Sequence, residues 1–401
     1  MITRKLRLVL CFLSILTVIV VQTACGKSTR QTTTVTETTQ TAMATSIGDT
    51  NNAVEQKTQH PVEEELDRVA EWTEPALEAL VRDKIGKPTG DIMVSELDYI
   101  WGIELYGASH IFFNGNGGYD MYLSEDSSFD ISDRVWSSNI DMHNYTVEKR
   151  WNLGGTYEVD EVQYERGPIK SLVDFSNFRN VKFLIAYKNS LQNISGLTRL
   201  TQLKELRLYE NTISDISDLA DLKQIILLDL SGNPISDVSP LASLKHLEGL
   251  YLRGTEVVDL NGLQEMDGLR ILNLSSSPVR SINELKGLNK LERLYFNKTC
   301  IEDLTPLIGK NTIKSIFIGN LDIERIDLTP IRTLENLSGL NIVQDKAELQ
   351  NFEVLTELKE LILLDIIPNV NLSGEDISWL RRNLANGNIV QPPLPSNYII
   401  G

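Results

Sequence analysis

Tyrosine and arginine side chains recur at intervals through the middle of this 401-residue chain. Both types combine a large contact area with hydrogen-bonding groups, and both are enriched where proteins bind other macromolecules. An alternative is structural, because aromatic residues favour strands and an arginine beside a glutamate can be a solvated pair. Seven such residues and one phenylalanine form a candidate contact surface, which we call the stripe: Tyr187, Arg207, Tyr209, Tyr251, Arg253, Arg293, Tyr295 and Phe317.

Residues suited to catalysis or metal binding show no comparable pattern. The four histidines, His60, His110, His143 and His246, lack metal-ligand spacing. Motifs of hydrolases, zinc proteases and nucleotide-binding enzymes do not occur in a suitable context. The acids between Asp120 and Asp133 could serve an enzyme together with His143, but a charge run in a turn-rich segment is usually solvated. We therefore expect no catalytic residues, no metal and no cofactor.

The N-terminal residues have the form of an export signal. Arg4, Lys5 and Arg7 precede an apolar run, Leu8 to Val21, that is short for a membrane-spanning helix. An ordinary signal peptide that is cleaved and lost would have this composition. The segment therefore predicts a protein that leaves the cytoplasm.

Cys25 follows Gln22-Thr23-Ala24 at the end of the signal. Small residues before a cysteine resemble the lipobox of bacterial lipoproteins, although Gln22 stands where that pattern favours leucine. The resemblance implies that a diacylglyceryl group with palmitate-type chains is attached to Cys25. Because two acyl chains anchor durably, we expect a protein lipid-anchored on the extracellular face of a bacterial cell membrane. The alternative is an ordinary cleaved signal peptide.

Composition sets further limits. Residues 25–61 are rich in threonine and poor in large apolar residues, which predicts a disordered tether. The whole chain has 55 acidic and 38 basic residues and a net charge of -17. Nucleic-acid binding needs a basic footprint, so the charge argues against nucleic acid as a partner.

A repeat of 22 residues organises residues 159–371 of the chain. The last apolar residue of each L-x-x-L-x-L run falls at Ala186, Leu208, Leu230, Leu252, Leu274, Phe296 and Ile318. We extend the series back to Tyr164 and forward to Ile342 and Leu363, after spacings of 24 and 21. Alternating apolar residues predict a short strand with one buried face, and apolar residues three apart predict 3₁₀ or extended backbone after it.

The turn after each predicted strand carries a side chain that can hydrogen-bond open backbone groups. It is asparagine at Asn189, Asn211 and Asn233, and a hydroxyl residue at Thr255, Ser277 and Thr299. The hydroxyl residues have a weaker capacity for this bonding. We expect the asparagines to stack as a ladder.

The stretch from Asn233 to Leu241 resembles the N-x-I-S-D-I-S-P-L segment of internalin-type repeats, and residues 211–216 and 301–307 repeat it. The resemblance covers about half of the chain. It implies a leucine-rich-repeat solenoid of the α/β class: a right-handed curved stack, with a parallel sheet on the concave face. Short 3₁₀ or extended segments would line the convex face, and helical caps would close the ends.

Five parts follow from these patterns. We expect a lipoprotein signal peptide (1–24), a disordered tether (25–61), a helical N-terminal cap with an aromatic-rich insert (62–158), the repeats (159–371), and a cap helix with a tail (372–401). Residues 74–86 and 375–384 have the pattern of the cap helices. The insert at about 107–156 is either a β-rich elaboration of the cap or a loop that carries binding aromatics.

The expected function is binding rather than catalysis, in a monomer whose concave face holds a protein partner. The stripe lies on outward-facing positions of the predicted strands, which would place it on that face. A carbohydrate, cell-wall or mucin-type glycan binder is the alternative, because stacked aromatics and polar side chains also suit sugars. An enzyme that uses the insert is a third reading.

Overall fold

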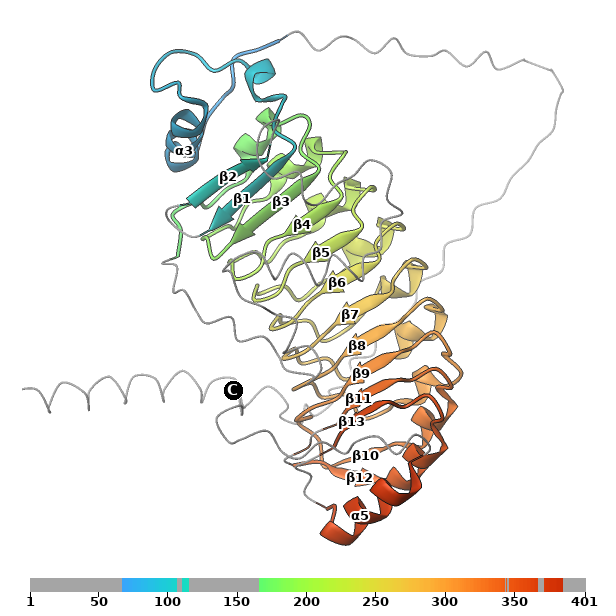
Figure 1. Cartoon of the computed structure of the whole chain (residues 1–401). Coiled ribbons are helices and arrows are strands. Elements are labelled where there is room, and N and C mark those ends of the chain that lie inside the picture. The colour runs from blue at the N-terminus through green and yellow to red at the C-terminus, as the bar shows by residue number, and fades with distance from the viewer. Residues whose placement is uncertain are drawn as a thin grey trace, which may run out of the picture. The chain divides into compact units, whose positions relative to one another are not determined.

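The computed structural model of the chain describes residues 67–106, 110–114, 166–342, 344, 346–366 and 371–384. The chain divides into two units, Met1–Asp67 and Arg68–Gly401, and the elements named below all belong to the second. This unit contains one long sheet (Figure 1). Its strands are β1 (Gly102–Tyr106), β2 (His110–Asn114), β3 (Phe183–Tyr187), β4 (Glu205–Arg207), β5 (Leu227–Asp229), β6 (Gly249–Tyr251), β7 (Ile271–Asn273), β8 (Arg293–Tyr295), β9 (Ser315–Phe317), β11 (Gly339–Asn341) and β13 (Leu363–Asp365).

The strands stack in chain order and run parallel, except that β2 lies antiparallel on the outer edge of β1. From β3 to β9 the paired residues are 22 apart, as in the row Leu206, Leu228 and Leu250. The repeat read from the sequence is thus the register of the sheet. Each turn of the chain, which we call a rung, contributes one strand.

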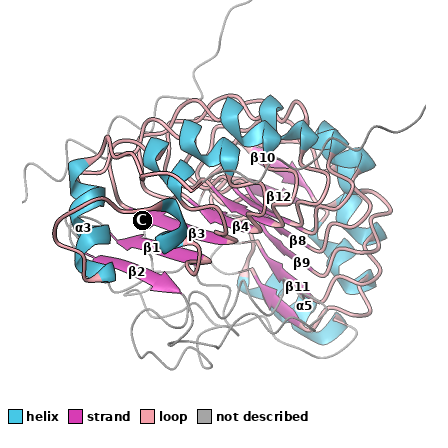
Figure 2. Ribbon diagram, turned by 90° about the horizontal axis from the view of Figure 1, so that it is seen from above, coloured by secondary structure: helices cyan, strands magenta, loops and turns pink. Residues whose placement is uncertain are grey.

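Short 3₁₀ helices occupy the other side of each rung. Figure 2 shows helices along the outer side of the arc and strands along the inner side. Asp or Asn side chains accept a hydrogen bond from the backbone N–H two residues later, as Asp215 does from Ser217 at 2.9 Å. The helices are η5 (Val173–Asn177), η6 (Ser195–Arg199), η7 (Ser217–Asp221), η8 (Ser239–Ser243), η9 (Leu263–Glu265), η10 (Asn283–Gly287), η11 (Thr305–Leu307), η12 (Thr329–Thr333) and η13 (Phe352–Glu357).

The apolar residues of all rungs meet between the sheet and the 3₁₀ helices. They form one continuous core that runs from Ala70 in the N-terminal cap to Leu384 at the C-terminal end. A single rung cannot enclose its own leucines, whereas each stacked rung covers the next. The sheet, the alternating 3₁₀ segments and this core make a leucine-rich-repeat solenoid, as the sequence predicts.

The asparagine ladder is present at Asn211 and Asn233, where it joins neighbouring rungs. The Asn189 amide instead donates to Tyr187 O of its own rung at 3.0 Å, and its Oδ1 has no partner. The Asn211 amide donates to Leu208 O in its own rung at 3.0 Å and to Ala186 O in the preceding rung at 2.7 Å. Its Oδ1 accepts a bond from Leu191 N of the preceding rung at 3.3 Å. Asn233 repeats these bonds one rung later.

The hydroxyl residues in the same place bond only within their own rung. Thr255 Oγ1 donates to Leu252 O at 2.7 Å, and Thr299 Oγ1 donates to Phe296 O at 2.8 Å. Ser277 makes the same bond to Leu274 O. The weaker bonding capacity expected of these residues is confirmed.

The first strand comes from an unexpected part of the chain. We expected the run ending at Tyr164 to lie beside Ala186, but β1 holds this place, with Leu105 opposite Ala186. The reason is that Ile100, Ile103 and Leu105 have the same L-x-x-L-x-L spacing and are all buried. Tyr164 itself lies outside the described residues. The chain rejoins this rung at Gly167, whose N–H donates to Lys188 O at 2.9 Å.

The last rung also differs from the prediction. Leu364 pairs with Leu340, so the buried residue equivalent to Ile342 is Ile366 and the prediction of Leu363 is wrong. The spacing of 24 therefore continues, because Leu361, Leu364 and Ile366 are the buried set. Leu363 itself belongs to the outward-facing positions.

The longer rungs at this end carry a second, small sheet. Strands β10 (Arg325–Asp327) and β12 (Glu348–Gln350) pair in parallel with Ile326 opposite Leu349. The Asn371 side chain lies where a third strand would pair. It donates to Leu349 O at 2.8 Å and accepts from Leu349 N at 3.0 Å.

Helices close both ends of the core, as predicted. Helix α3 (Pro75–Ile85) buries Leu77 and Val81 and ends at Gly86, which is left-handed at φ 67°. The buried Asp174 carboxylate of the first rung accepts bonds from Thr73 N and Glu74 N, at 2.9 and 2.8 Å, just before this helix. At the other end, α5 (Gly374–Asn383) begins with a Ser373–Asp376 capping box.

Candidate functional site: the concave face of the sheet

The outward-facing side chains of the strands form three columns on the concave face. The middle column runs Ile185, Arg207, Asp229, Tyr251, Asn273, Tyr295 and Phe317, which are paired strand to strand. One flanking column contains Glu205, Leu227, Gly249, Ile271 and Arg293, and the other contains Tyr187, Tyr209 and Arg253. The structure thus places all eight stripe residues on this face.

Four aromatic residues of the stripe form two stacked pairs. The rings of Tyr187 and Tyr209 have centroids 4.4 Å apart at an interplanar angle of 19°. Those of Tyr295 and Phe317 are 4.6 Å apart at 10°. Stacking of aromatic rings across neighbouring strands is the arrangement expected if these residues serve the sheet itself rather than a partner. These aromatics therefore stabilise the sheet, and their outer surfaces still line the concave face.

Arg207 is embedded among acids rather than open to a partner. Its side chain is buried, and Nε donates to Glu205 Oε1 at 2.6 Å. Burial lowers the pKa of Arg207, but Glu205 and Asp229 outweigh that effect and raise it overall. Burial raises the pKa of Asp229, which the hydrogen bond from Ser231 N at 2.9 Å offsets only in part. The stripe is therefore interrupted here by a buried ion pair.

Tyr251 lies at the centre of the face, in a small apolar cluster. It packs with Tyr295 against Leu227 and Ile271, which are 1% and 3% exposed. Its Oη is buried and has no hydrogen-bond partner, and the same holds for Ser275 Oγ in the neighbouring strand segment. Burial is the main cause that raises the pKa of Tyr251. A buried hydroxyl without a partner is costly, so the cluster of Tyr251, Tyr295, Leu227 and Ile271 is held together by its apolar packing rather than by hydrogen bonds.

Sequence reasoning missed four residues of this face as members of the site. Leu227 and Ile271 occupy outward-facing positions, yet they form the apolar centre. Glu205 and Asp229 hold Arg207 in place. The signal was present in the columns, since an apolar residue at an outward-facing position is informative when its strand neighbours are aromatic.

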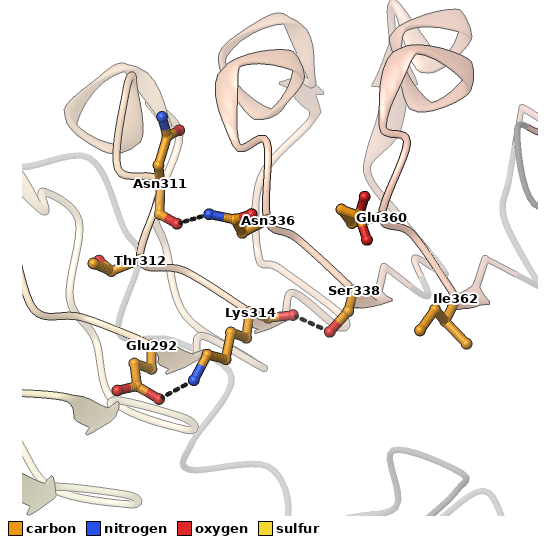
Figure 3. Close-up of a pocket in the computed structure, with 8 residues that line it drawn as sticks. All are labelled: Glu292, Asn311, Thr312, Lys314, Asn336, Ser338, Glu360 and Ile362. Atoms are coloured by element: carbon orange, nitrogen blue, oxygen red, sulfur yellow. Dashed lines mark hydrogen bonds and ion pairs between the residues drawn. The ribbon is translucent and has the colours of Figure 1, made fainter.

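A hollow lies on the flank, at the start of strands β8, β9, β11 and β13 (Figure 3). The Glu292–Lys314 ion pair at 2.9 Å and the bond from Asn336 to Asn311 O at 2.7 Å bridge successive rungs there. Beyond these, Thr312, Ser338, Glu360 and Ile362 line it. Because its polar groups mainly link rungs to one another, this hollow is part of the scaffold, and the stripe does not reach it.

Several predicted features lie outside the described residues. They include Cys25, the tether, and the insert at 107–156 apart from the strand residues at 110–114. Among the residues that are described, no three His, Cys, Asp or Glu side chains gather as metal ligands would. No helix within these same ranges has the length and apolarity to cross a membrane.

Comparison with known proteins gives structural likeness without a sequence match. No family model and no curated protein matches the sequence. An internalin (inlF) of Listeria monocytogenes matches with a TM-score of 0.51 at 22% identity, over 73% of this chain and 76% of that one. A leucine-rich-repeat protein of Leptospira interrogans matches with a TM-score of 0.42 at 20% identity, over 54% of this chain and 68% of that one. Together with the rungs described above, the likeness to the internalin establishes that this chain has the leucine-rich-repeat fold.

Proposed function

We propose that the chain is a non-catalytic binding protein that holds a protein partner on the concave face of its repeat array. The observation that carries this proposal is the apolar cluster around Tyr251 and Tyr295 at the centre of a face rich in tyrosine and arginine. Protein hot spots combine such aromatics with arginine around a desolvated centre. Leu227 and Ile271 supply that apolar centre here.

A glycan partner is the second candidate, and the geometry of the aromatic pairs bears on it. Sugars bind flat on open aromatic faces. In the Tyr187–Tyr209 and Tyr295–Phe317 pairs each ring covers one face of the other. This arrangement presents less open ring area than single aromatics would, and it favours a protein.

Site-specific photocrosslinking tests where binding occurs. A photoreactive phenylalanine analogue would replace Phe317 on the concave face or Lys290, which is exposed on the turn before β8. We expect crosslinks to protein from position 317 in the cells that make this chain, and a much lower yield from position 290. Equal yields from both positions would contradict the proposal. Crosslinks to glycan alone would favour the second candidate.

We also propose that Cys25 carries a lipid that holds the protein on the extracellular face of a bacterial membrane. The support is the sequence pattern of residues 4–25, with its basic start, apolar run and terminal cysteine. Labelling with an alkyne analogue of palmitate should mark the natural chain and leave Cys25→Ser unmarked. The variant should also move from the membrane fraction to the medium. Equal labelling of the two proteins would rule out a lipid on Cys25.

A further inference from the structure

Charge is distributed unevenly along the concave face. From β6 to β9 the outward-facing positions hold two arginines, Arg253 and Arg293, and no acid. From β1 to β5 the corresponding positions hold Glu104, Glu205 and Asp229 against the single Arg207. The basic half is unusual in a chain whose net charge is -17.

The electrostatic attraction of a docked segment depends on the charges close to it rather than on the net charge of the whole chain. Interactions between exposed charges are largely screened beyond about 10 Å at moderate salt. The nearest acid in the three columns is Asp229, one strand before Tyr251, and its field acts on Arg207 and Arg253 alike. Arg207 is already held by Glu205 at 2.6 Å. The charge that a segment lying over β6 to β9 meets is therefore positive.

The chemistry beside the arginines is specific as well. Tyr295 lies in β8 together with Arg293, and Phe317 lies in the neighbouring strand β9. The outer surface of this stacked pair is apolar. An extended segment that crosses these strands meets positive charge and an aromatic surface within four neighbouring strands.

From this arrangement we infer that strands β6 to β9 bind an acidic segment of the protein partner, with carboxylates beside Arg253 and Arg293 and an apolar side chain on the Tyr295–Phe317 pair. The inference rests on the proposed function and adds the chemistry of the partner.

Two synthetic peptides test this inference with the full chain. One alternates glutamate with leucine, and the other is identical except that lysine replaces each glutamate. Fluorescence anisotropy would measure the affinity of each. We expect the glutamate peptide to bind about tenfold more tightly, since two charge pairs of about 0.7 kcal/mol each sum to the roughly 1.4 kcal/mol that gives this ratio. Equal binding, or no binding of the glutamate peptide, would overturn the inference.

Charge reversal locates the effect. The double variant Arg253→Glu with Arg293→Glu should reverse the preference between the two peptides. Its matched control is Lys286→Glu with Lys290→Glu, which changes the net charge equally at two exposed residues in and just after η10. The control should keep the preference. A preference that the arginine variant keeps, or that the control loses, contradicts the inference.

Failure of the inference can be told apart from failure of the proposed function. If photocrosslinks concentrate at position 317 while the peptides bind equally, the concave face binds a protein of different chemistry. If positions 317 and 290 crosslink equally, the proposed function itself is wrong. Circular dichroism of each variant shows whether it is folded before its binding is compared.

Discussion

The rungs of β4 and β5 and those of β6 to β8 use the same architecture with different polar side chains. In the first set the turns carry asparagines that bond to the preceding rung, and the concave face holds acids. In the second set, serine and threonine close only their own turns, and the concave face holds arginines. The comparison shows that the buried leucines specify the path of the chain in each rung. The polar positions can vary the hydrogen bonding between rungs and the charge of the concave face.

The largest expected effect separates the two kinds of turn. Asn211→Ala removes the amide that joins two rungs and leaves Ala186 O and Leu191 N, both buried, without this partner. Because an unsatisfied buried group costs about 1–3 kcal/mol, we expect the free energy of unfolding to fall by about 2–5 kcal/mol. Urea denaturation followed by circular dichroism would measure it. A loss no larger than that of a hydroxyl variant would break the comparison.

A smaller effect is expected at the hydroxyl turns. Thr299→Val keeps the size of the side chain and removes its one bond, from Oγ1 to Phe296 O at 2.8 Å. Since a typical hydrogen bond contributes a net 0.5–1.5 kcal/mol, the variant should lose about 1 kcal/mol. The same denaturation experiment checks it, and a loss equal to that of Asn211→Ala would show that rung-to-rung bonding is not the cause.

The smallest effect concerns Asp229 and depends on pH. Its second-half counterpart Asn273 accepts the same bond, from Ser275 N at 3.0 Å, so an amide suits this position. Burial raises the pKa of Asp229 above its value in the unfolded chain, so the folded state binds this proton more tightly. Ionised Asp229 therefore lowers stability at neutral pH, and that cost disappears as the pH falls through its raised pKa.

Asp229→Asn should thus melt slightly above the natural chain at pH 7. The difference should shrink with acidification and vanish below the ordinary aspartate pKa of about 3.9. Thermal melts over a pH series would show this convergence. A variant that melts lower at neutral pH would mean that the attraction between Asp229 and Arg207 outweighs its burial.

Replacing both Tyr251 and Tyr295 with alanine would be a less clear test of the stripe than charge reversal. Tyr251 and Tyr295 pack against Leu227 and Ile271, so truncating both tyrosines removes part of an apolar cluster as well as a contact surface. Loss of binding in such a double variant would be ambiguous. Charge changes at the exposed Arg253 avoid this problem, since its side chain is outside the cluster.

Periodicity predicted most of the fold, because a buried apolar residue recurring every 22 positions is compatible with few architectures besides a stacked repeat. It failed at both ends for the same reason. Near the start, the runs at Ile100–Leu105 and at Val159–Tyr164 have equal spacing, and only tertiary pairing selects β1 as the neighbour of β3. Near the end, Leu363 and Ile366 are both apolar, and the register with β11 decides between them.

The candidate site was less predictable than the fold. Outward-facing columns follow from strand alternation, so the stripe residues could be placed on one face. Which of them are open to a partner depends on neighbours in three dimensions. The sequence places Arg207 and Tyr251 alike on outward-facing strand positions. In the structure, Arg207 is neutralised by Glu205, whereas Tyr251 Oη has no hydrogen-bond partner.

The side-chain amide of Asn371 bears on association with other chains through strand edges. Exposed strand edges can recruit strands from other chains and so begin aggregation. Asn371 takes up both the N–H and the carbonyl of Leu349, the central residue of β12, through one side chain. It imitates the first contact of an incoming strand and thereby withholds those groups from another chain. At the β12 edge of the small sheet, a single side chain thus occupies the backbone groups of Leu349 that an incoming strand would bond to.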